Sequence, residues 1–145
     1  MFCCYKFYFQ KCKNELNIQE IDYEKNSYSY PNIVGGLVGK AKNCYFEKCK
    51  NTGDIKGHFS TVGGIIGQSE EKLILKEISH RGDIIAQNSI GGLVGVLYNC
   101  PTVAMYCYCL ADNLVSLTNE NTCGNIIGKI TQQNALKTTE KFEFK

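Results

Sequence analysis

The sequence lacks both a charge surplus and a long apolar run. Sixteen Lys and Arg face fourteen Asp and Glu, so no basic surplus exists to neutralise a phosphate backbone, and we expect no nucleic-acid partner. No apolar run approaches the roughly 20 residues that a membrane-spanning helix needs, so we expect no membrane insertion. The remaining class is a single globular domain, for which 145 residues are enough to bury a core.

The N-terminus lacks the features of a secretion signal. Residues 1–9 are apolar, but their only charge, Lys6, lies inside the apolar stretch, and no small-residue cleavage site follows. A complete chain would therefore be expected in the cytoplasm. An inner or C-terminal piece of a longer protein would be expected at the cell surface or outside the cell. The sequence leaves both alternatives open.

Tryptophan is absent and only two prolines occur, whereas fourteen glycines accompany many β-branched and aromatic residues. This composition favours short strands joined by tight turns. A Gly-Gly-aliphatic-aliphatic-Gly motif recurs, with copies that begin at Val34, Val62, Ile90 and, in degenerate form, Cys123. The first three starts are 28 residues apart and the last interval is 33. The segments between copies also match, since Asn-Thr-Gly-Asp-Ile (51–55) is answered by His-Arg-Gly-Asp-Ile (80–84).

A further degenerate unit precedes these copies. Residues 7–14 parallel residues 44–51 at an offset of 37 instead of 28, so about nine residues are inserted, and we place this insertion at 22–31. Nearly the whole chain is therefore one repeat domain. Its parts are a degenerate unit with an inserted loop (5–33), three repeats (34–61, 62–89 and 90–122), a partial last unit (123–130) and a C-terminal tail or cap (131–145).

Each unit contains three short extended pieces bounded by Gly, Asn and Asp, which is typical of strands and too short for helices. The glycine motif itself is expected to be the first of these strands, so that each coil has three sides. One unit cannot bury its apolar side alone. The repeat therefore predicts an all-β fold, a right-handed parallel β-solenoid (β-helix) of about four coils with a 28-residue period. Equivalent positions would stack about 4.8 Å apart. Two aliphatic ladders are expected: Leu37, Ile65, Leu93 and Ile126, and then Ile18, Ile55, Ile84 and Leu114.

The paired glycines of the motif permit either close approach between neighbouring coils or a strained turn. A phosphate-binding loop is the other chemistry that glycine pairs suggest. No Gly-Lys-Ser/Thr and no helical pattern follow the motif, and it repeats four times. We therefore expect no cofactor.

The complete unit, seen best over residues 34–57, resembles the GLUG repeat, named for its Gly-Leu-hydrophobic-Gly core. Gly-Gly-Leu-Val-Gly, Asn-Cys-Tyr and Asn-Thr-Gly-Asp-Ile carry the resemblance, which covers residues 33–128 and the degenerate copy at 7–18. Such repeats occur in large surface and secreted proteins of bacteria and of some microbial eukaryotes. The resemblance implies a non-catalytic, adhesin-like display module whose partner is a host or matrix protein or a glycan.

Several of the nine cysteines exchange with aliphatic residues between repeats. With one residue inserted, Cys44 aligns with Leu73 and Cys49 aligns with Ile78. Cys123 takes the place that valine or isoleucine holds in the other copies of the motif. A cysteine in such a position acts as a small core hydrophobe.

A metal site and a disulfide are the other roles for these cysteines. No pair of Cys-x-x-Cys spacings exists, as a structural zinc site would require. If a disulfide forms, Cys12 and Cys49 are the expected pair, because stacked equivalents lie within bonding reach. The odd number of cysteines favours reduced thiols.

Four polar residues fall in register at one turn of each unit: Asn17, Asp54, Asp83 and Asn113. A polar ladder that caps successive turns explains them. Asp54 stacked on Asp83 would repel it unless Lys56 or a cation intervenes, so these two carboxylates are a weak calcium candidate. We expect no other metal site.

Nothing in the sequence predicts an enzyme. His58 and His80 are far apart in sequence, and neither accompanies the nucleophile and acid of a catalytic triad. A glycan-processing β-helix would need two converging carboxylates. Glu70, Glu71 and Glu77 cluster in one unit only, among lysines, which is typical of a solvated face. A truncated gene product without a separate function is a further alternative.

Overall fold

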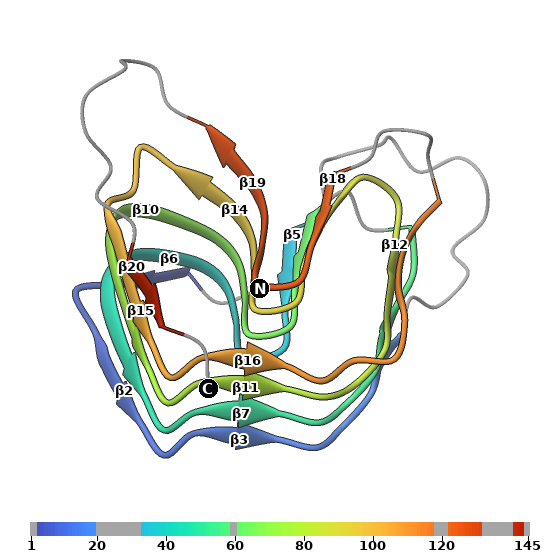
Figure 1. The fold of residues 1–145 in the computed structure, drawn as a ribbon, viewed down its shortest axis with the longest axis horizontal. Helices are drawn as coiled ribbons and strands as arrows, with labels where there is room; N and C mark the ends of the chain where they lie inside the picture. The colour runs from blue at the N-terminus through green and yellow to red at the C-terminus, as the bar shows by residue number, and fades with distance from the viewer. Residues whose placement is uncertain (1–2, 20–32, 59–60, 118–121, 132–140, 144–145) are drawn as a thin grey trace.

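The computed structural model describes residues 3–19, 33–58, 61–117, 122–131 and 141–143, and it is all-β (Figure 1). The chain forms a parallel β-solenoid of about three turns with a period of about 29 residues. All of the strand pairs are parallel, and each joins one coil to the next. The expected solenoid architecture is therefore present, but the expectation of about four coils is slightly too high.

The strands stack into four sheets, which we name A to D. Sheet A contains β1 (Cys3–Tyr5), β2 (Tyr8–Gln10), β6 (Val38–Glu47), β10 (Ile66–Lys76), β14 (Val94–Tyr98), β15 (Thr102–Met105), β19 (Ile127–Thr131) and β20 (Lys141–Glu143). Sheet B contains β3 (Lys13–Asn14), β7 (Lys50–Asn51), β11 (Ser79–His80) and β16 (Tyr108–Cys109). Sheet C contains β4 (Ile18–Gln19), β8 (Ile55–Lys56), β12 (Ile84–Ala86) and β17 (Leu114–Ser116). Sheet D contains β5 (Ile33–Gly35), β9 (Thr61–Gly63), β13 (Ser89–Gly91) and β18 (Thr122–Gly124).

The glycine-rich motif is a corner, not the single strand that the sequence suggested. Sheet D ends at its first glycine, as in Ile33–Gly35, and sheet A resumes at Val38 after a bend of two residues. Each turn of the solenoid therefore has four sides instead of three. The additional side divides the interior of the solenoid into two lobes (Figure 1).

The two lobes have separate hydrophobic cores. The larger core lies inside sheets A and B and includes Phe46, Leu75 and Ile78, all fully buried. The smaller core lies between sheets C and D and includes Ile55 and Ile84. Burial of each such side chain contributes roughly 1.5–3 kcal/mol before the entropy of ordering is subtracted.

The expected ladder residues lie in register. Ile84 pairs with Ile55 and with Leu114, and Ile18 pairs with Ile55. The amide of Leu37 donates to the carbonyl of Ile65, and the same contact continues to Leu93 and Ile126, each at 3.0 Å. Leu37 itself is only partly buried.

A one-residue bulge explains why the period exceeds 28. Lys42 pairs with Glu70, 28 residues later, whereas Cys44 pairs with Leu73, 29 residues later. Two residues, Glu71 and Lys72, stand opposite the single Asn43, so the extra residue lies between Glu70 and Leu73. Asn43 and Glu71 both have positive φ, 54° and 67°. The inserted loop expected at 22–31 lies outside the described residues. In the C-terminal tail, β20 pairs with β15, which is the position that a capping strand would take.

Candidate functional site

The three glycines in each of the first three copies of the motif are required by close backbone approach. A Cβ on Gly63 would lie 1.8 Å from the carbonyl oxygen of Ile66, within the same corner. A Cβ on Gly64 would lie 2.1 Å from the carbonyl oxygen of Gly92 in the next coil. A Cβ on Gly67 would lie 2.7 Å from the carbonyl oxygen of Gly39 in the preceding coil. No described glycine has a positive φ, so close approach is the correct interpretation and the motif serves packing.

The polar turn residues form a hydrogen-bonded ladder along the solenoid. Asn17 Oδ1 accepts from the amide of Asp54 at 2.9 Å, and Asp54 Oδ1 accepts from the amide of Asp83 at 2.8 Å. Asp83 Oδ1 then accepts from the amide of Asn113 at 3.1 Å. The hydrogen bond from Asp83, and then Lys56, hold the pKa of Asp54 below its usual range.

Asp54 and Asp83, the two carboxylates of the candidate calcium site, both belong to this hydrogen-bonded ladder. Asp54 Oδ2 lies 3.2 Å from Lys56 Nζ, and Asp83 Oδ2 accepts from Asn113 Nδ2 at 3.1 Å. Each carboxylate oxygen therefore has a protein donor, which calcium would have to displace. Within the described part of the chain, no group of three or more His, Cys, Asp or Glu could hold a metal ion.

Seven cysteines are free thiols in this structure: Cys12, Cys44, Cys49, Cys100, Cys107, Cys109 and Cys123. Cys44, Cys49, Cys100 and Cys107 are buried, and burial raises the pKa of Cys107 to about 11. Cys12 and Cys49 occupy equivalent positions, and the amide of Lys50 donates to the carbonyl of Cys12 at 2.9 Å. Cys123 is exposed instead of buried, because β18, on which it lies, is the edge strand of sheet D.

A second polar ladder, which the sequence analysis missed, lies inside the solenoid on sheet B. Asn51 is fully buried; its Nδ2 donates to the carbonyls of Gly53 and Gly64, and its Oδ1 accepts from the amide of Gly53. His80 lies in the next coil, where it pairs with Asn51, and it is also buried. Neither ring nitrogen of His80 makes a hydrogen bond to a described residue. The sequence does contain one sign of this ladder, because His80 aligns with Asn51 when residues 80–84 are matched to residues 51–55.

We expect His80→Asn to stabilise the fold, because asparagine already satisfies the same position in the preceding coil. Burial is the main cause that lowers the pKa of His80; nearby backbone groups of Gly82 and Asn51 only partly offset it. The folded state therefore prefers neutral histidine, and stability falls as the pH drops below about 6.5, the ordinary histidine pKa. Urea unfolding should show a gain of about 1 kcal/mol at pH 7 and a larger gain at pH 5.

The matched control for this substitution is His58→Asn, at the exposed histidine. Because this variant retains His80, its stability should still decrease toward pH 5, as in the natural chain. If His80→Asn is no more stable than the natural chain at either pH, the buried ring is not the acid-sensitive group.

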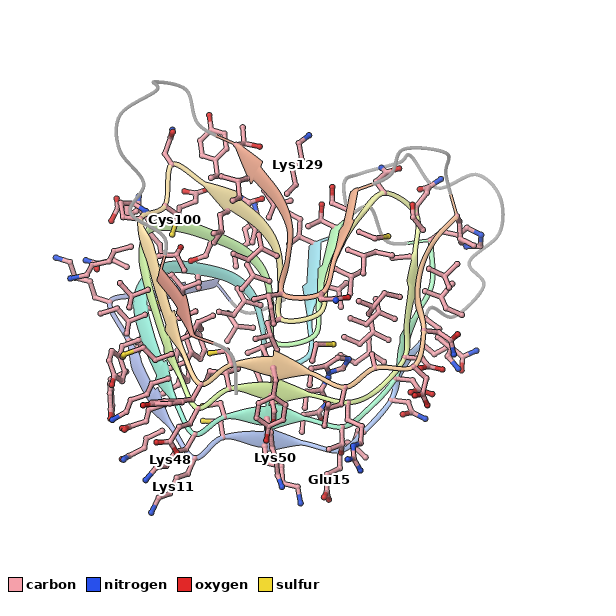
Figure 2. All side chains as sticks on the ribbon, viewed as in Figure 1. Lys11, Glu15, Lys48, Lys50, Cys100 and Lys129 are labelled. Atoms are coloured by element: carbon pink, nitrogen blue, oxygen red, sulfur yellow. The ribbon has the colours of Figure 1, made fainter. Side chains whose placement is uncertain are left out.

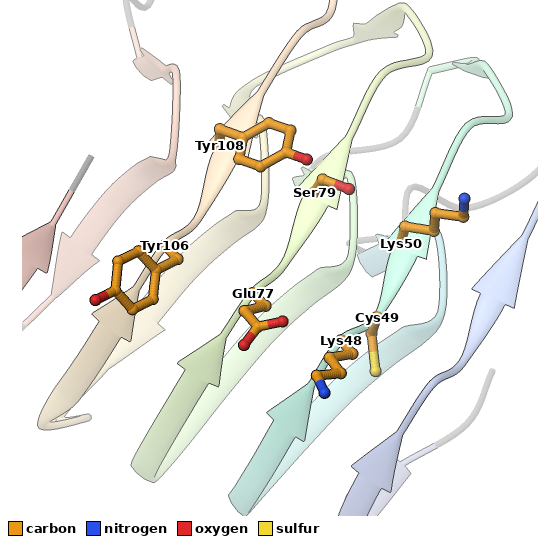
Figure 3. Close-up of a pocket in the computed structure, with 7 residues that line it drawn as sticks. All are labelled: Lys48, Cys49, Lys50, Glu77, Ser79, Tyr106 and Tyr108. Atoms are coloured by element: carbon orange, nitrogen blue, oxygen red, sulfur yellow. The ribbon is translucent and has the colours of Figure 1, made fainter. Parts of the chain in front are cut away.

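The outer face of sheet B carries a shallow groove of about 540 Å³ (Figure 3). Two rows of side chains line it, one residue from each of three coils. The first row is Lys48, Glu77 and Tyr106, and the second row is Lys50, Ser79 and Tyr108. In Figure 2, Lys11, Lys48 and Lys50 point outward on this side.

The first row lies at the corner between sheets A and B, where each residue has a left-handed backbone. The φ angles of Lys48, Glu77 and Tyr106 are 53°, 55° and 56°. This conformation is uncommon for residues other than glycine. Its recurrence in successive coils places the three side chains on one line, parallel to the direction of stacking (Figure 3).

The three glutamates of the central unit do not form a cluster of paired acids. Glu71 makes an ion pair with Lys42 at 3.0 Å, and Glu70 accepts from Gln68 at 2.7 Å. Both lie at the bulge in β10. Glu77 contributes the single carboxylate among the residues that line the groove.

No protein-family model, curated protein or solved structure matches this chain. Its site must therefore be interpreted from its own residues. Among the described residues, no helix is long and apolar enough to cross a membrane.

Proposed function

We propose that this chain is a non-catalytic structural or adhesion module, a part of a larger cell-surface or secreted protein. The observation that carries the proposal is the outer face of sheet B, where exposed Tyr, Lys and Glu side chains of successive coils line an open groove. A long face with a repeating spacing is suited to an extended partner. The resemblance to GLUG repeats supports the same class of function, with a host or matrix protein or a glycan as partner.

We further infer that the coil is right-handed, since a connection between parallel strands of one sheet is right-handed in about 98% of cases. A right-handed coil is also the form expected from the repeat. Its handedness determines the direction in which Lys48, Glu77 and Tyr106 follow one another around the surface.

A glycan-processing β-helix is the alternative from a different class. Such an enzyme uses a pair of carboxylates that flank the scissile bond. The groove contributes Glu77 alone, while Glu71 is paired with Lys42. These contacts favour binding over hydrolysis. A truncated gene product without a separate function is the other alternative, and it predicts no ligand for the groove.

The first test is the location and size of the native protein. An antibody against this chain should detect, in surface or secreted fractions of its own cells, a band well above the mass of 145 residues. A band of the size of this chain, confined to the cytosol, would contradict the proposal. The absence of any band, with the transcript also absent, would favour the truncated product.

A further inference from the structure

The groove on sheet B combines two aromatic side chains with charged and hydroxyl groups in a fixed order. Tyr106 and Tyr108 are 42% and 44% exposed although both are large and apolar in part. They belong to the same coil and lie on either side of the buried Cys107, Tyr106 at the corner and Tyr108 on β16. An exposed tyrosine pair offers flat rings to a ligand, with a hydroxyl at the edge of each ring.

The groups beside the tyrosines change from coil to coil. Glu77 and Ser79 come next, and Lys48 and Lys50 follow in the coil beyond (Figure 3). Lys11 and Lys13 continue the same two rows into the first coil, where Lys13 makes an ion pair with Glu15. The groove therefore runs from an aromatic end, through hydroxyl and carboxylate groups, to a cationic end.

Of the extended ligands, an oligosaccharide fits this order. Coils repeat about every 4.8 Å, which is comparable to the length of one pyranose ring, so each sugar would meet one coil. The apolar face of a sugar stacks on tyrosine. Its hydroxyls donate to Glu77 and exchange hydrogen bonds with Ser79. The lysines require an acidic group on the sugar at that end.

The same contacts disfavour a peptide and a nucleic acid. Strands β7 and β11 are each paired on both sides, so an extended peptide cannot add to them as a further strand. A phosphate backbone along the groove would pass over the carboxylate of Glu77, which repels it.

We propose that this groove binds an acidic oligosaccharide along the solenoid axis, with one sugar ring at the Tyr106 and Tyr108 pair and the acidic group at Lys48 and Lys50. The proposal rests on the adhesion function above and specifies its ligand class. Sugar binding can be measured on the purified, folded chain wherever the native protein is located. The sugar-binding proposal and the adhesion function can therefore fail separately. A cytosolic protein that binds the sugar would contradict the adhesion function alone.

The test is calorimetric titration of the purified chain with two acidic probes that leave uncharged rings between their acidic groups: a hyaluronan oligosaccharide and sialyllactose. A methyl-esterified hyaluronan oligosaccharide and lactose are the matched neutral probes. We expect saturable binding of at least one acidic probe, tighter than its neutral counterpart and weakened by salt. Amide resonances of β7, β11 and β16 should shift on titration. Absence of binding by both acidic probes would overturn the proposal.

Two variants separate the aromatic and cationic contributions. Tyr108→Ala should weaken binding of the acidic probe and its neutral counterpart alike, by up to about tenfold for an aromatic contact. Lys48→Ala with Lys50→Ala should remove the preference for the acidic probe and its salt dependence. Tyr8→Ala and Lys129→Ala, at exposed positions on sheet A, are the controls and should bind as the natural chain does.

Circular dichroism must show that each variant keeps its strand content. If the sheet A variants lose as much affinity as the groove variants, the ligand lies elsewhere and the proposed site is wrong. A single-stranded oligonucleotide that binds as tightly as the acidic sugar, at the same shifted amides, would make the groove a general polyanion site and would also overturn the proposal.

Discussion

Replacing Gly64 by alanine is expected to destabilise the fold by about 3 kcal/mol or more, an effect typical of overpacking against groups that cannot move. The added Cβ would lie 2.1 Å from the carbonyl oxygen of Gly92 and 2.4 Å from Cγ of His80. The first of these atoms belongs to the backbone of the next coil. Relief of the contact would therefore require two coils to separate and their hydrogen bonds to lengthen, as between the amide of Gly64 and the carbonyl of Gly91.

The matched control for this variant is present in the natural sequence. Asn125 occupies the equivalent position in the last copy of the motif, where β18 is the edge strand of sheet D. No described strand stacks beyond it, so a side chain is accommodated. Asn125→Ala should change the free energy of unfolding by less than about 0.5 kcal/mol.

Urea unfolding followed by circular dichroism measures both variants. A small and equal effect at the two positions would mean that neighbouring coils are farther apart than in this structure. A large and equal effect would mean that a further coil covers Asn125. Either result would contradict the explanation of the motif by backbone contact between coils.

The stacking order could be predicted from the sequence because it depends only on the period. Equivalent residues such as Ile55 and Ile84 were identified by alignment of one unit with the next, and they pair in the structure. The bulge between Glu70 and Leu73 could also be predicted, since one inserted residue was needed to align Cys44 with Leu73. Parallel in-register stacking is the direct physical consequence of a repeated apolar pattern.

The cross-section of the coil could not be predicted in the same way. Sequence alignment between units does not report the angle at which one side meets the next. The glycine motif was therefore assigned to a strand, although Gly36 and Leu37 form a bend between sheets D and A. The close backbone contacts at the corner between sheets D and A explain the glycines, and they are seen only in the three-dimensional structure.

The groove was missed for a different reason. Lys48, Glu77 and Tyr106 are equivalent by position but share no chemistry, so a search for repeated residue types passes over them. Their common property is a left-handed backbone at a corner, which no residue type among the three indicates. The signal that would identify such a surface is the divergence of outward positions between otherwise similar units.

Tyr45 and Phe46 are neighbouring residues of β6 whose side chains lie on opposite faces of the strand. Phe46 is fully buried and stacks on Phe9, with ring centroids 4.7 Å apart and an interplanar angle of 9°. Phe46→Ala should leave a cavity in the larger core and lower the free energy of unfolding by about 3–5 kcal/mol. Equilibrium unfolding in urea measures this loss.

Tyr45→Ala is the control, because Tyr45 is only partly buried and stacks on Tyr8 at the outer face. Its loss should cost about 1 kcal/mol, the scale of one aromatic pair. Successive residues of a strand point to opposite faces, so a shift of register by one residue would exchange the two effects. If Tyr45→Ala is the more damaging variant, the side of β6 that faces the core is assigned wrongly. In that case the ladders that continue from Phe46 to Leu75 and Ala104 would be wrong with it.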